Sequence, residues 1–347
     1  MKDSNHNKIT ICVEGGKETG LGHVRRCIVI ARELQKRKRY VHFFINDDPS
    51  VVDWIRQNGF DYTFISLTHF SASDTIIKND HLFMIDTKKR IDELIRSLKT
   101  KGCKIILLDN VTPSRLLADV VIYPTAIYEN NLDWTGFKAK VFGGSEYIPV
   151  AESFIKAGKK TDQKKLQPPY KILVTMGGSD PNHLTGKIIS SLLKSQVPLS
   201  IKAVIGPAFS SDSLLDAILG GRHQNLQVIR GKNELSSDMA ESHIAITALG
   251  TTIFELACMG IPAILIANYR TDEMDMAAFK KLGIALPLGY HKNVSDFEIR
   301  HAVEELLRDK LLWENISQKA KRLIDGLGTQ RIADIIEKIL RGGSFVS

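Results

Sequence analysis

The sequence predicts an α/β protein made of two doubly wound domains, each with a parallel sheet covered by helices. Three observations lead to this expectation. Short β-branched and apolar runs alternate with amphipathic stretches along the whole chain, a pattern typical of strands joined by crossover helices. The chain has 347 residues, more than a single hydrophobic core usually holds. A polar, Lys-rich stretch also divides it near the middle.

Segments with the composition of buried strands occur in both halves with the same rhythm. They span residues 9–14, 40–45, 62–65, 81–85, 104–108 and 120–122, and then 171–175, 200–205, 226–229, 244–247, 263–266 and 285–288. Because such strands alternate with helical patterns, we expect each half to form one parallel sheet. Two such sheets facing each other would create a cleft lined by the loops that follow the strands.

The Lys-rich stretch predicts the domain boundary. Residues 156–169 are poor in apolar side chains and end in two prolines, which continue neither a helix nor a central strand. We therefore expect a first domain of residues 1–157, a linker of residues 158–169 and a second domain of residues 170–347 that includes the C-terminal helices. The apolar stripe at residues 332–340 leaves open whether the last helix packs on its own domain or on the first.

The composition favours a cytoplasmic, globular protein. Hydrophobic residues make up 43% and charged residues 25% of the chain, and no apolar run is long enough to span a bilayer. The first eight residues lack the apolar centre of a secretory signal. The four cysteines lie in or beside apolar segments without metal-ligand spacing, so we expect reduced core thiols.

The formal net charge of +8 would suit a polyanionic partner. The basic residues are spread along segments such as 32–39 and 159–165, without interleaved aromatic residues on which bases could stack. A solvated surface with a mild attraction for phosphate is therefore expected, and nucleic acid is not expected as a partner.

A glycine-rich turn, residues 15–23, separates the first predicted strand from a helical pattern. Gly20 and Gly22 would let backbone N–H groups face an anion at the helix N-terminus. His23 in the first helical turn is a candidate general base, and a simple helix cap is the alternative. Arg26 is either an outer-face charge or a phosphate ligand. The turn is not a P-loop, because no Gly-Lys-Ser/Thr follows it.

A second glycine turn follows the first strand of the second half. Gly177 and Gly178 permit a close backbone approach and Ser179 offers a hydroxyl, so these residues are suited to a diphosphate. The alternative is an ordinary strand-to-helix turn with Asp180 or Asn182 as the N-cap.

A third turn follows the predicted strand 244–247. Gly250, Thr251 and Thr252 would present backbone donors and hydroxyls to phosphate oxygens at a helix N-terminus. Glu255 lies one turn further on, where a carboxylate can accept both ribose hydroxyls; a favourable position near the helix dipole is the alternative explanation.

Together these motifs resemble the UDP-2,4-diacetamido-2,4,6-trideoxy-β-L-altropyranose hydrolase family of the pseudaminic acid pathway, within the GT-B glycosyltransferase-like superfamily. The resemblance covers nearly the whole chain. The matching stretches are residues 20–27 (Gly-Leu-Gly-His-Val-x-Arg-Cys), 144–149 (Gly-x-Glu-Tyr-Ile-Pro), 177–181, 250–255, 260–262 and Asn268. They are specific as a set, whereas none is specific alone.

The resemblance implies a GT-B-like fold in which the second domain holds UDP and offers the sugar to the first. It implies that His23 activates water for inverting attack at the anomeric carbon, and that neither a metal ion nor another cofactor is needed. Tyr147 and Asn268 are carried over as substrate contacts because they lie in matching stretches.

The chain departs from the family pattern in three places. Where the hydrolases have Arg-x-Asp in the first strand, this chain has Cys12 at the start of Cys-Val-Glu. Where they have Asp-x-Tyr after a later strand, it has Asp86-Thr-Lys88, and Tyr269 replaces an expected Gln. The first two departures lie in the sugar-facing domain, so the resemblance leaves the identity of the sugar open.

Three functions are compatible with these residues. The first is a UDP-sugar hydrolase of surface polysaccharide or nonulosonate synthesis. The second is a GT-B glycosyltransferase, in which a hydroxyl of a sugar or lipid-linked acceptor replaces water. The third is a catalytically silent protein that binds a nucleotide sugar. A dehydrogenase is disfavoured, because only Asp47 or Asp48 could serve as the acidic residue after the second strand.

Overall fold

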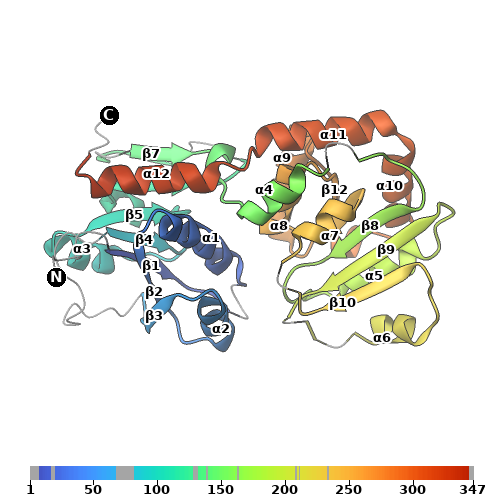
Figure 1. Ribbon diagram of the computed structural model, residues 1–347, viewed down its shortest axis with the longest axis horizontal. Coiled ribbons are helices and arrows are strands. Elements are labelled where there is room, and N and C mark those ends of the chain that lie inside the picture. Colours follow the sequence, from blue (N-terminus) through green and yellow to red (C-terminus); the bar gives the residue numbers. More distant parts are fainter. Residues whose placement is uncertain are drawn as a thin grey trace. The chain divides into compact units, whose positions relative to one another are not determined.

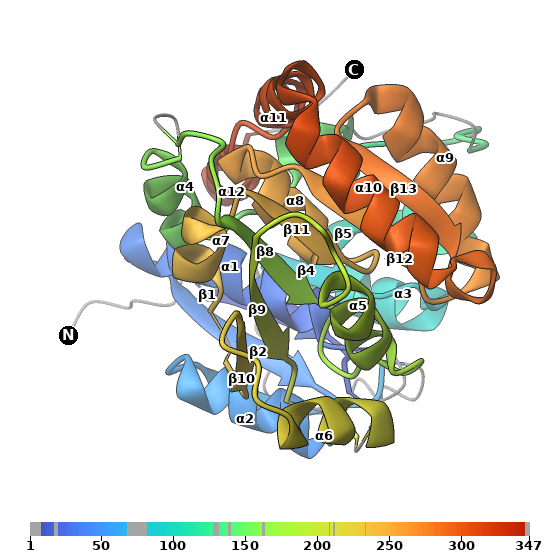
Figure 2. The same ribbon diagram turned by 90° about the vertical axis from the view of Figure 1, so that its right-hand side faces the viewer.

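The computed structural model describes residues 8–16, 20–67, 82–127, 132–137, 140–161, 164–207, 209–210, 212–232 and 234–343. The chain divides into two compact units. The first contains Met1–Pro149 together with Leu327–Ser347, and the second contains Val150–Gly326. Each unit is built around one parallel sheet (Figures 1 and 2).

The first unit contains a seven-stranded sheet in the order β3-β2-β1-β4-β5-β6-β7. Each pair of neighbouring strands is parallel. The strands are β1 (Lys8–Val13), β2 (Tyr40–Ile45), β3 (Asp61–Phe64), β4 (Leu82–Asp86), β5 (Lys104–Leu108), β6 (Val120–Tyr123) and β7 (Lys140–Gly143).

Helices cover both faces of this sheet because alternate strand residues bury their side chains on opposite sides. Ile9 and Ile11 face one core, and Cys12 faces the other. The helices of the first unit are α1 (Gly22–Lys36), α2 (Pro49–Gln57), α3 (Asp92–Thr100) and α12 (Gly328–Leu340), with 3-10 helices η2 (Pro113–Leu117) and η3 (Ser145–Tyr147).

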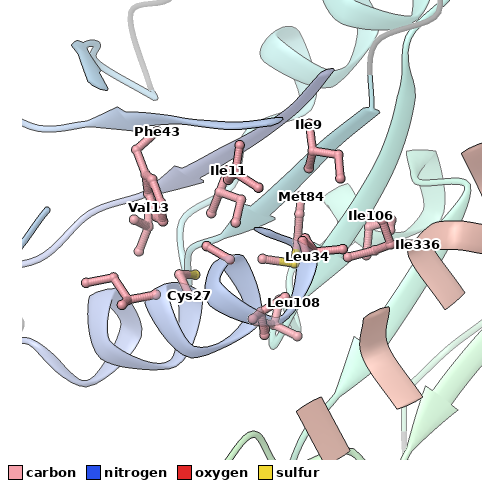
Figure 3. Packing of buried hydrophobic residues seen from close by; sticks show 14 of the residues in the cluster. Ile9, Ile11, Val13, Cys27, Leu34, Phe43, Met84, Ile106, Leu108 and Ile336 are labelled. Atoms are coloured by element: carbon pink, nitrogen blue, oxygen red, sulfur yellow. The ribbon is translucent and has the colours of Figure 1, made fainter. Parts of the chain in front are cut away.

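The C-terminal helix α12 belongs to the first unit, where it lies along α1 (Figure 1). Its apolar stripe enters the core, and Figure 3 shows Ile336 among Leu34, Met84 and Ile106. Ion pairs add to this anchoring, since Arg39 Nη2 lies 2.5 Å from Glu337 Oε2. The assignment of α12 to the second domain therefore differs from the structure, because an apolar stripe does not identify the surface that it covers.

Replacing Ile336 with Ala is expected to lower the free energy of unfolding of the first unit by about 2–4 kcal/mol, because the fully buried side chain leaves a cavity. Urea unfolding measures this loss as a lower midpoint. Lys338→Ala on the exposed face of the same helix is the control and should change the midpoint little. Equal midpoints for the two variants would contradict the assigned role of α12.

The second unit contains a six-stranded parallel sheet in the order β10-β9-β8-β11-β12-β13. Its strands are β8 (Tyr170–Thr175), β9 (Leu199–Ile205), β10 (Leu226–Arg230), β11 (Ile244–Thr247), β12 (Ala263–Ala267) and β13 (Ala285–Tyr290). One core packs α5 (Leu184–Leu192) and α10 (Asp296–Arg308) against the sheet, and Figure 2 shows α10 beside β13.

The remaining elements of the second unit complete its two helical layers. They are α4 (Glu152–Gly158), α6 (Ser213–Gly220), α7 (Ser236–Glu241), α8 (Thr251–Met259), α9 (Glu273–Leu282) and α11 (Lys310–Leu323), with η4 (Arg270–Asp272) and η5 (His291–Asn293). Contacts of α7, α8 and α9 with β8, β11 and β12 provide the second layer. No helix in the described ranges is long and apolar enough to cross a membrane.

The doubly wound α/β class predicted from the sequence is confirmed, and each predicted strand overlaps an observed one. His81, the first residue of one predicted strand, lies outside the described residues. The edge strand β7 was not predicted, because its four residues follow a loop without a clear periodic pattern.

The division at Pro149 lies before the predicted linker. The segment after it is tied to the second unit, because Thr161 Oγ1 donates a 2.7 Å hydrogen bond to the Met259 carbonyl. Gly158 also packs closely on the backbone of Met259. Residues 162 and 163 of the predicted linker lie outside the described residues.

Candidate functional site

Both sheets have a topological switch point, where strand order reverses and ligands bind in open α/β folds. In the first unit β1 lies between β2 and β4, so the switch point lies between β1 and β4. In the second unit it lies between β8 and β11. The three glycine turns singled out in the sequence follow β1, β8 and β11, so all three lie at switch points.

His23 lies at the start of α1 and is held by a carboxylate from β4. Its Nδ1 atom is 2.5 Å from Asp86 Oδ1. Asp86 is 1% exposed, whereas the His23 side chain is 22% exposed. Because an ionised carboxylate only accepts hydrogen bonds, this contact places the imidazole proton on Nδ1 and leaves Nε2 as the basic nitrogen.

Arg26, one turn along α1, links this pair to a second carboxylate. Its Nε and Nη2 atoms donate to the two oxygens of Asp86, each at 2.6 Å. Nη2 also donates to Asp109 Oδ2 at 3.1 Å. The same nitrogen lies 3.0 Å from His23 Nδ1, a contact between two donors rather than a hydrogen bond. Arg26 therefore orients carboxylates, which argues against the phosphate-binding role considered for it.

The guanidinium also keeps Asp86 ionised. Burial alone would raise the pKa of Asp86, but the charge and hydrogen bonds of Arg26, with the hydrogen bond of His23, lower that pKa to about 2. Burial would likewise lower the pKa of Arg26, and Asp86 and Asp109 raise it instead. At neutral pH the site therefore holds a fixed negative charge behind His23.

The first glycine turn is closed on itself and fastened to the loop after β2. Gly16 and Gly20 exchange backbone hydrogen bonds of 3.1 and 2.8 Å, and Asn46 binds both backbone groups of Gly15. The amide of Gly20 is thus already used, contrary to the expectation that it faces an anion. Gly22 begins α1. Residues 17–19 of the turn lie outside the described residues.

The turn after β8 exposes Gly177, Gly178 and Ser179. The helix that follows starts only at Leu184, and Asp180 accepts hydrogen bonds from the amides of Leu184 and Thr185 at 2.9 and 2.8 Å. The N-cap alternative is therefore correct for Asp180. Its carboxylate occupies the helix end, so a diphosphate here would depend on the loop backbone and Ser179 rather than on the helix dipole.

The turn after β11 has a different construction. Helix α8 begins at Thr251, directly after Gly250, and within the described part of the chain no side chain caps its first turn. Thr251, Thr252 and Glu255 are half-buried on this helix. Its first amides and the two hydroxyls form the arrangement expected for binding phosphate at a helix N-terminus.

Asn268 joins the loop after β12 to the loop after β8. Its main-chain oxygen and Oδ1 each accept a 3.1 Å hydrogen bond from Asn182 Nδ2. The structure therefore brings Asn268 next to the β8 turn.

Tyr147 lies elsewhere, in η3 after the edge strand β7. Its ring packs 5.6 Å from the ring of Phe142, and η3 contacts α12. The cluster of His23 follows β1, β4 and β5, so these contacts do not include Tyr147. Arg25 stacks over Trp54, in agreement with its interpretation as an outer-face charge.

Asp109 was not identified from the sequence, and Asp86 was noted only as part of a departure from the family motif. Both are polar residues at the end of a buried apolar run, on β4 and after β5. That signal would have been sufficient to identify them, since the carboxyl ends of adjacent parallel strands meet at one edge. Across the described residues no group of three or more His, Cys, Asp or Glu side chains is arranged to hold a metal ion.

Comparison with known proteins gives distant relatives, and no family model matches the chain. An uncharacterized protein of Methanocaldococcus jannaschii is 28% identical over 274 residues, 75% of this chain but only 55% of that protein's length. The spore coat polysaccharide biosynthesis protein SpsG of Bacillus subtilis is 23% identical, covering 95% of this chain and 98% of that protein. The UDP-2,4-diacetamido-2,4,6-trideoxy-β-L-altropyranose hydrolase of Campylobacter jejuni is 25% identical, covering 55% and 67%.

Solved structures resemble the chain over nearly its whole length. MurG of Acinetobacter baumannii has a TM-score of 0.66 at 15% identity, covering 96% of this chain and 99% of its own. The glycosyltransferase of kitacinnamycin has a TM-score of 0.67 at 14% identity, covering 96% and 98%. At this identity the likeness concerns the fold. With two parallel Rossmann-like sheets, the chain therefore has a GT-B-like fold, as the sequence predicts.

Proposed function

We propose that this chain is a hydrolase that releases UDP from a UDP-activated amino or deoxy sugar. The observation that carries the proposal is the hydrogen bond between His23 Nδ1 and the buried Asp86, since it leaves Nε2 as a base at a switch point. Similarity to a named UDP-sugar hydrolase and to a polysaccharide biosynthesis protein supports it, and is consistent with a role in cytoplasmic synthesis of nonulosonates or surface polysaccharides.

In the proposed reaction His23 Nε2 removes a proton from water. The water oxygen forms a bond to the anomeric carbon while the bond from that carbon to the diphosphate oxygen breaks, and the electron pair leaves with UDP. The products are the free sugar of inverted configuration and UDP. A positioned base of this kind contributes about 10²–10⁴-fold to the rate, so stabilisation of the departing diphosphate must supply much of the remainder.

The second unit is proposed to bind the nucleotide. The uncapped first turn of α8, with Thr251 and Thr252, is suited to the diphosphate. Gly177, Gly178 and Ser179 add exposed backbone and a hydroxyl, and Glu255 is assigned to the ribose hydroxyls. Asn268 is assigned to the same site because Asn182 ties it to the β8 loop.

Gly178→Val is expected to abolish UDP binding without lowering the melting temperature. No protein atom lies within 4 Å of the Cβ position at Gly178, so the fold accommodates the side chain while a ligand meets it. Gly206→Ala is the contrasting variant, because its Cβ would lie 2.3 Å from the Gly178 carbonyl oxygen and should lower the melting temperature. Calorimetric titration with UDP and thermal denaturation test both. Normal UDP binding by Gly178→Val would remove this loop from the site.

A glycosyltransferase is the second candidate, and the fold shared with solved glycosyltransferases favours it. The same histidine would then deprotonate an acceptor hydroxyl instead of water, with a sugar or a lipid-linked sugar as the acceptor. The two candidates require the same donor and differ only in the nucleophile.

The purified chain should be incubated with a panel of UDP-sugars in the absence of an acceptor, and the products identified by mass spectrometry. Release of UDP with an equal amount of free sugar supports the hydrolase. Release that depends on an added acceptor supports the transferase. Tight binding of UDP-sugar without turnover under either condition would leave a silent nucleotide-sugar-binding protein.

A further inference from the structure

We infer that Asp109 contacts the sugar of the substrate, where its carboxylate accepts a hydrogen bond from a hydroxyl or an acetamido N–H and so contributes to the choice of sugar. The inference rests on the proposed function and extends it to a residue that neither the sequence motifs nor the comparisons assign.

Asp109 belongs to the cluster of His23 through a single shared atom. Arg26 Nη2 lies 3.1 Å from Asp109 Oδ2, 2.6 Å from Asp86 Oδ1 and 3.0 Å from His23 Nδ1. The side chain of Asp109 is 27% exposed, whereas those of Asp86 and Arg26 are 0% and 12% exposed. Asp109 is therefore the carboxylate of this cluster that a ligand can reach.

The charge of the cluster defines the class of ligand group. Asp86 alone neutralises Arg26 through two hydrogen bonds. Asp109 adds a second carboxylate, so with a neutral imidazole the four side chains carry one net negative charge. Such a site repels phosphate and carboxylate groups and favours hydrogen-bond donors. The hydroxyl and amide groups of an amino sugar are donors of this kind.

The backbone holds this carboxylate in one direction. Asp109 has a φ of +56°, a left-handed conformation that glycine adopts at lower cost. Its amide donates to the Ile122 carbonyl at 2.9 Å. The next residue, Asn110, is fully buried and donates to the carbonyls of Thr87 and Lys89. These contacts fix the conformation on both sides, so the carboxylate is positioned before a ligand arrives.

The test uses Asp109→Gly, because glycine suits the backbone and removes only the carboxylate. To exclude turnover, the variant is combined with His23→Ala and compared with His23→Ala alone. Calorimetry gives the Kd of UDP and of UDP-2,4-diacetamido-2,4,6-trideoxy-β-L-altropyranose. We expect an unchanged Kd for UDP, a Kd for the UDP-sugar raised about tenfold or more, and an unchanged melting temperature.

Asp119→Asn is the matched control. Its carboxylate is 28% exposed and pairs with Lys99, but it precedes β6 at the opposite end of the strands from Asp109. Both Kd values should stay unchanged in this variant. Equal affinity of the Asp109→Gly and reference proteins for the UDP-sugar would overturn the inference.

Failure of the proposed function gives a different result. A wild-type chain that binds the UDP-sugar but never hydrolyses it would refute the hydrolase, while a raised Kd in Asp109→Gly would still support the sugar contact. Hydrolysis by the wild type together with unaltered kcat/KM in Asp109→Gly would refute only the sugar contact. A chain that binds no UDP-sugar would refute both.

Discussion

His23→Asn is expected to lower the turnover of UDP-sugar at least about a hundredfold while leaving the affinity for UDP nearly unchanged. The variant removes the basic Nε2 atom, and a positioned general base contributes about 10²–10⁴-fold. UDP affinity should persist because the groups assigned to the nucleotide lie after β8 and β11, on the second unit. The measurements are kcat from UDP release and Kd from calorimetry with UDP.

Glu255→Ala provides the opposite control. This carboxylate is assigned to the ribose, so its loss should raise the Kd of UDP and the KM of the substrate with a smaller change in kcat. Thr251→Val and Thr252→Val should behave in the same way as Glu255→Ala. If His23→Asn keeps the wild-type kcat, His23 is not the base, whatever the behaviour of Glu255.

The strands could be predicted because their physical signal is local. A buried parallel strand is an apolar run of four to seven residues here, and runs such as Lys104–Leu108 and Ile244–Thr247 were placed at their observed bounds. The turns at the switch points could be predicted for the same reason, since glycines directly follow such runs.

The contacts within the site could not be predicted, because they join distant parts of the chain. His23 and Asp86 are 63 residues apart, and no spacing rule connects them. Nor does a glycine turn reveal which of its amides are already bonded: Gly20 is paired with Gly16, and Asp180 occupies the start of α5. The partner of α12 was unpredictable because an amphipathic stripe fits any apolar surface.

Asp86→Asn is expected to lower both turnover and stability. The variant leaves the Arg26 guanidinium, 12% exposed, without its carboxylate partner, and breaking a buried pair in this way costs about 3–5 kcal/mol. Turnover should fall because an amide does not fix the imidazole proton on Nδ1. The double variant Arg26→Met/Asp86→Asn removes both charges, so urea unfolding should show a recovery of stability while turnover stays low. Recovery of both would mean that Asp86 serves only the fold.

The same carboxylate predicts how the wild-type stability depends on pH. Above about pH 4 an aspartate is ionised in both the folded and the unfolded chain. Because the folded pKa of Asp86 is about 2, the unfolded chain takes up a proton between pH 4 and pH 2 that the folded chain does not. The contribution of Asp86 to the free energy of unfolding, roughly 2 kcal/mol, is therefore complete above pH 4 and lost as the pH falls through 2. Urea unfolding of the wild type and of Asp86→Asn at several pH values isolates this contribution, since only the wild type carries it. If the difference between the two proteins does not shrink on acidification, Asp86 is not held ionised by Arg26, and it would not fix the proton of His23 on Nδ1.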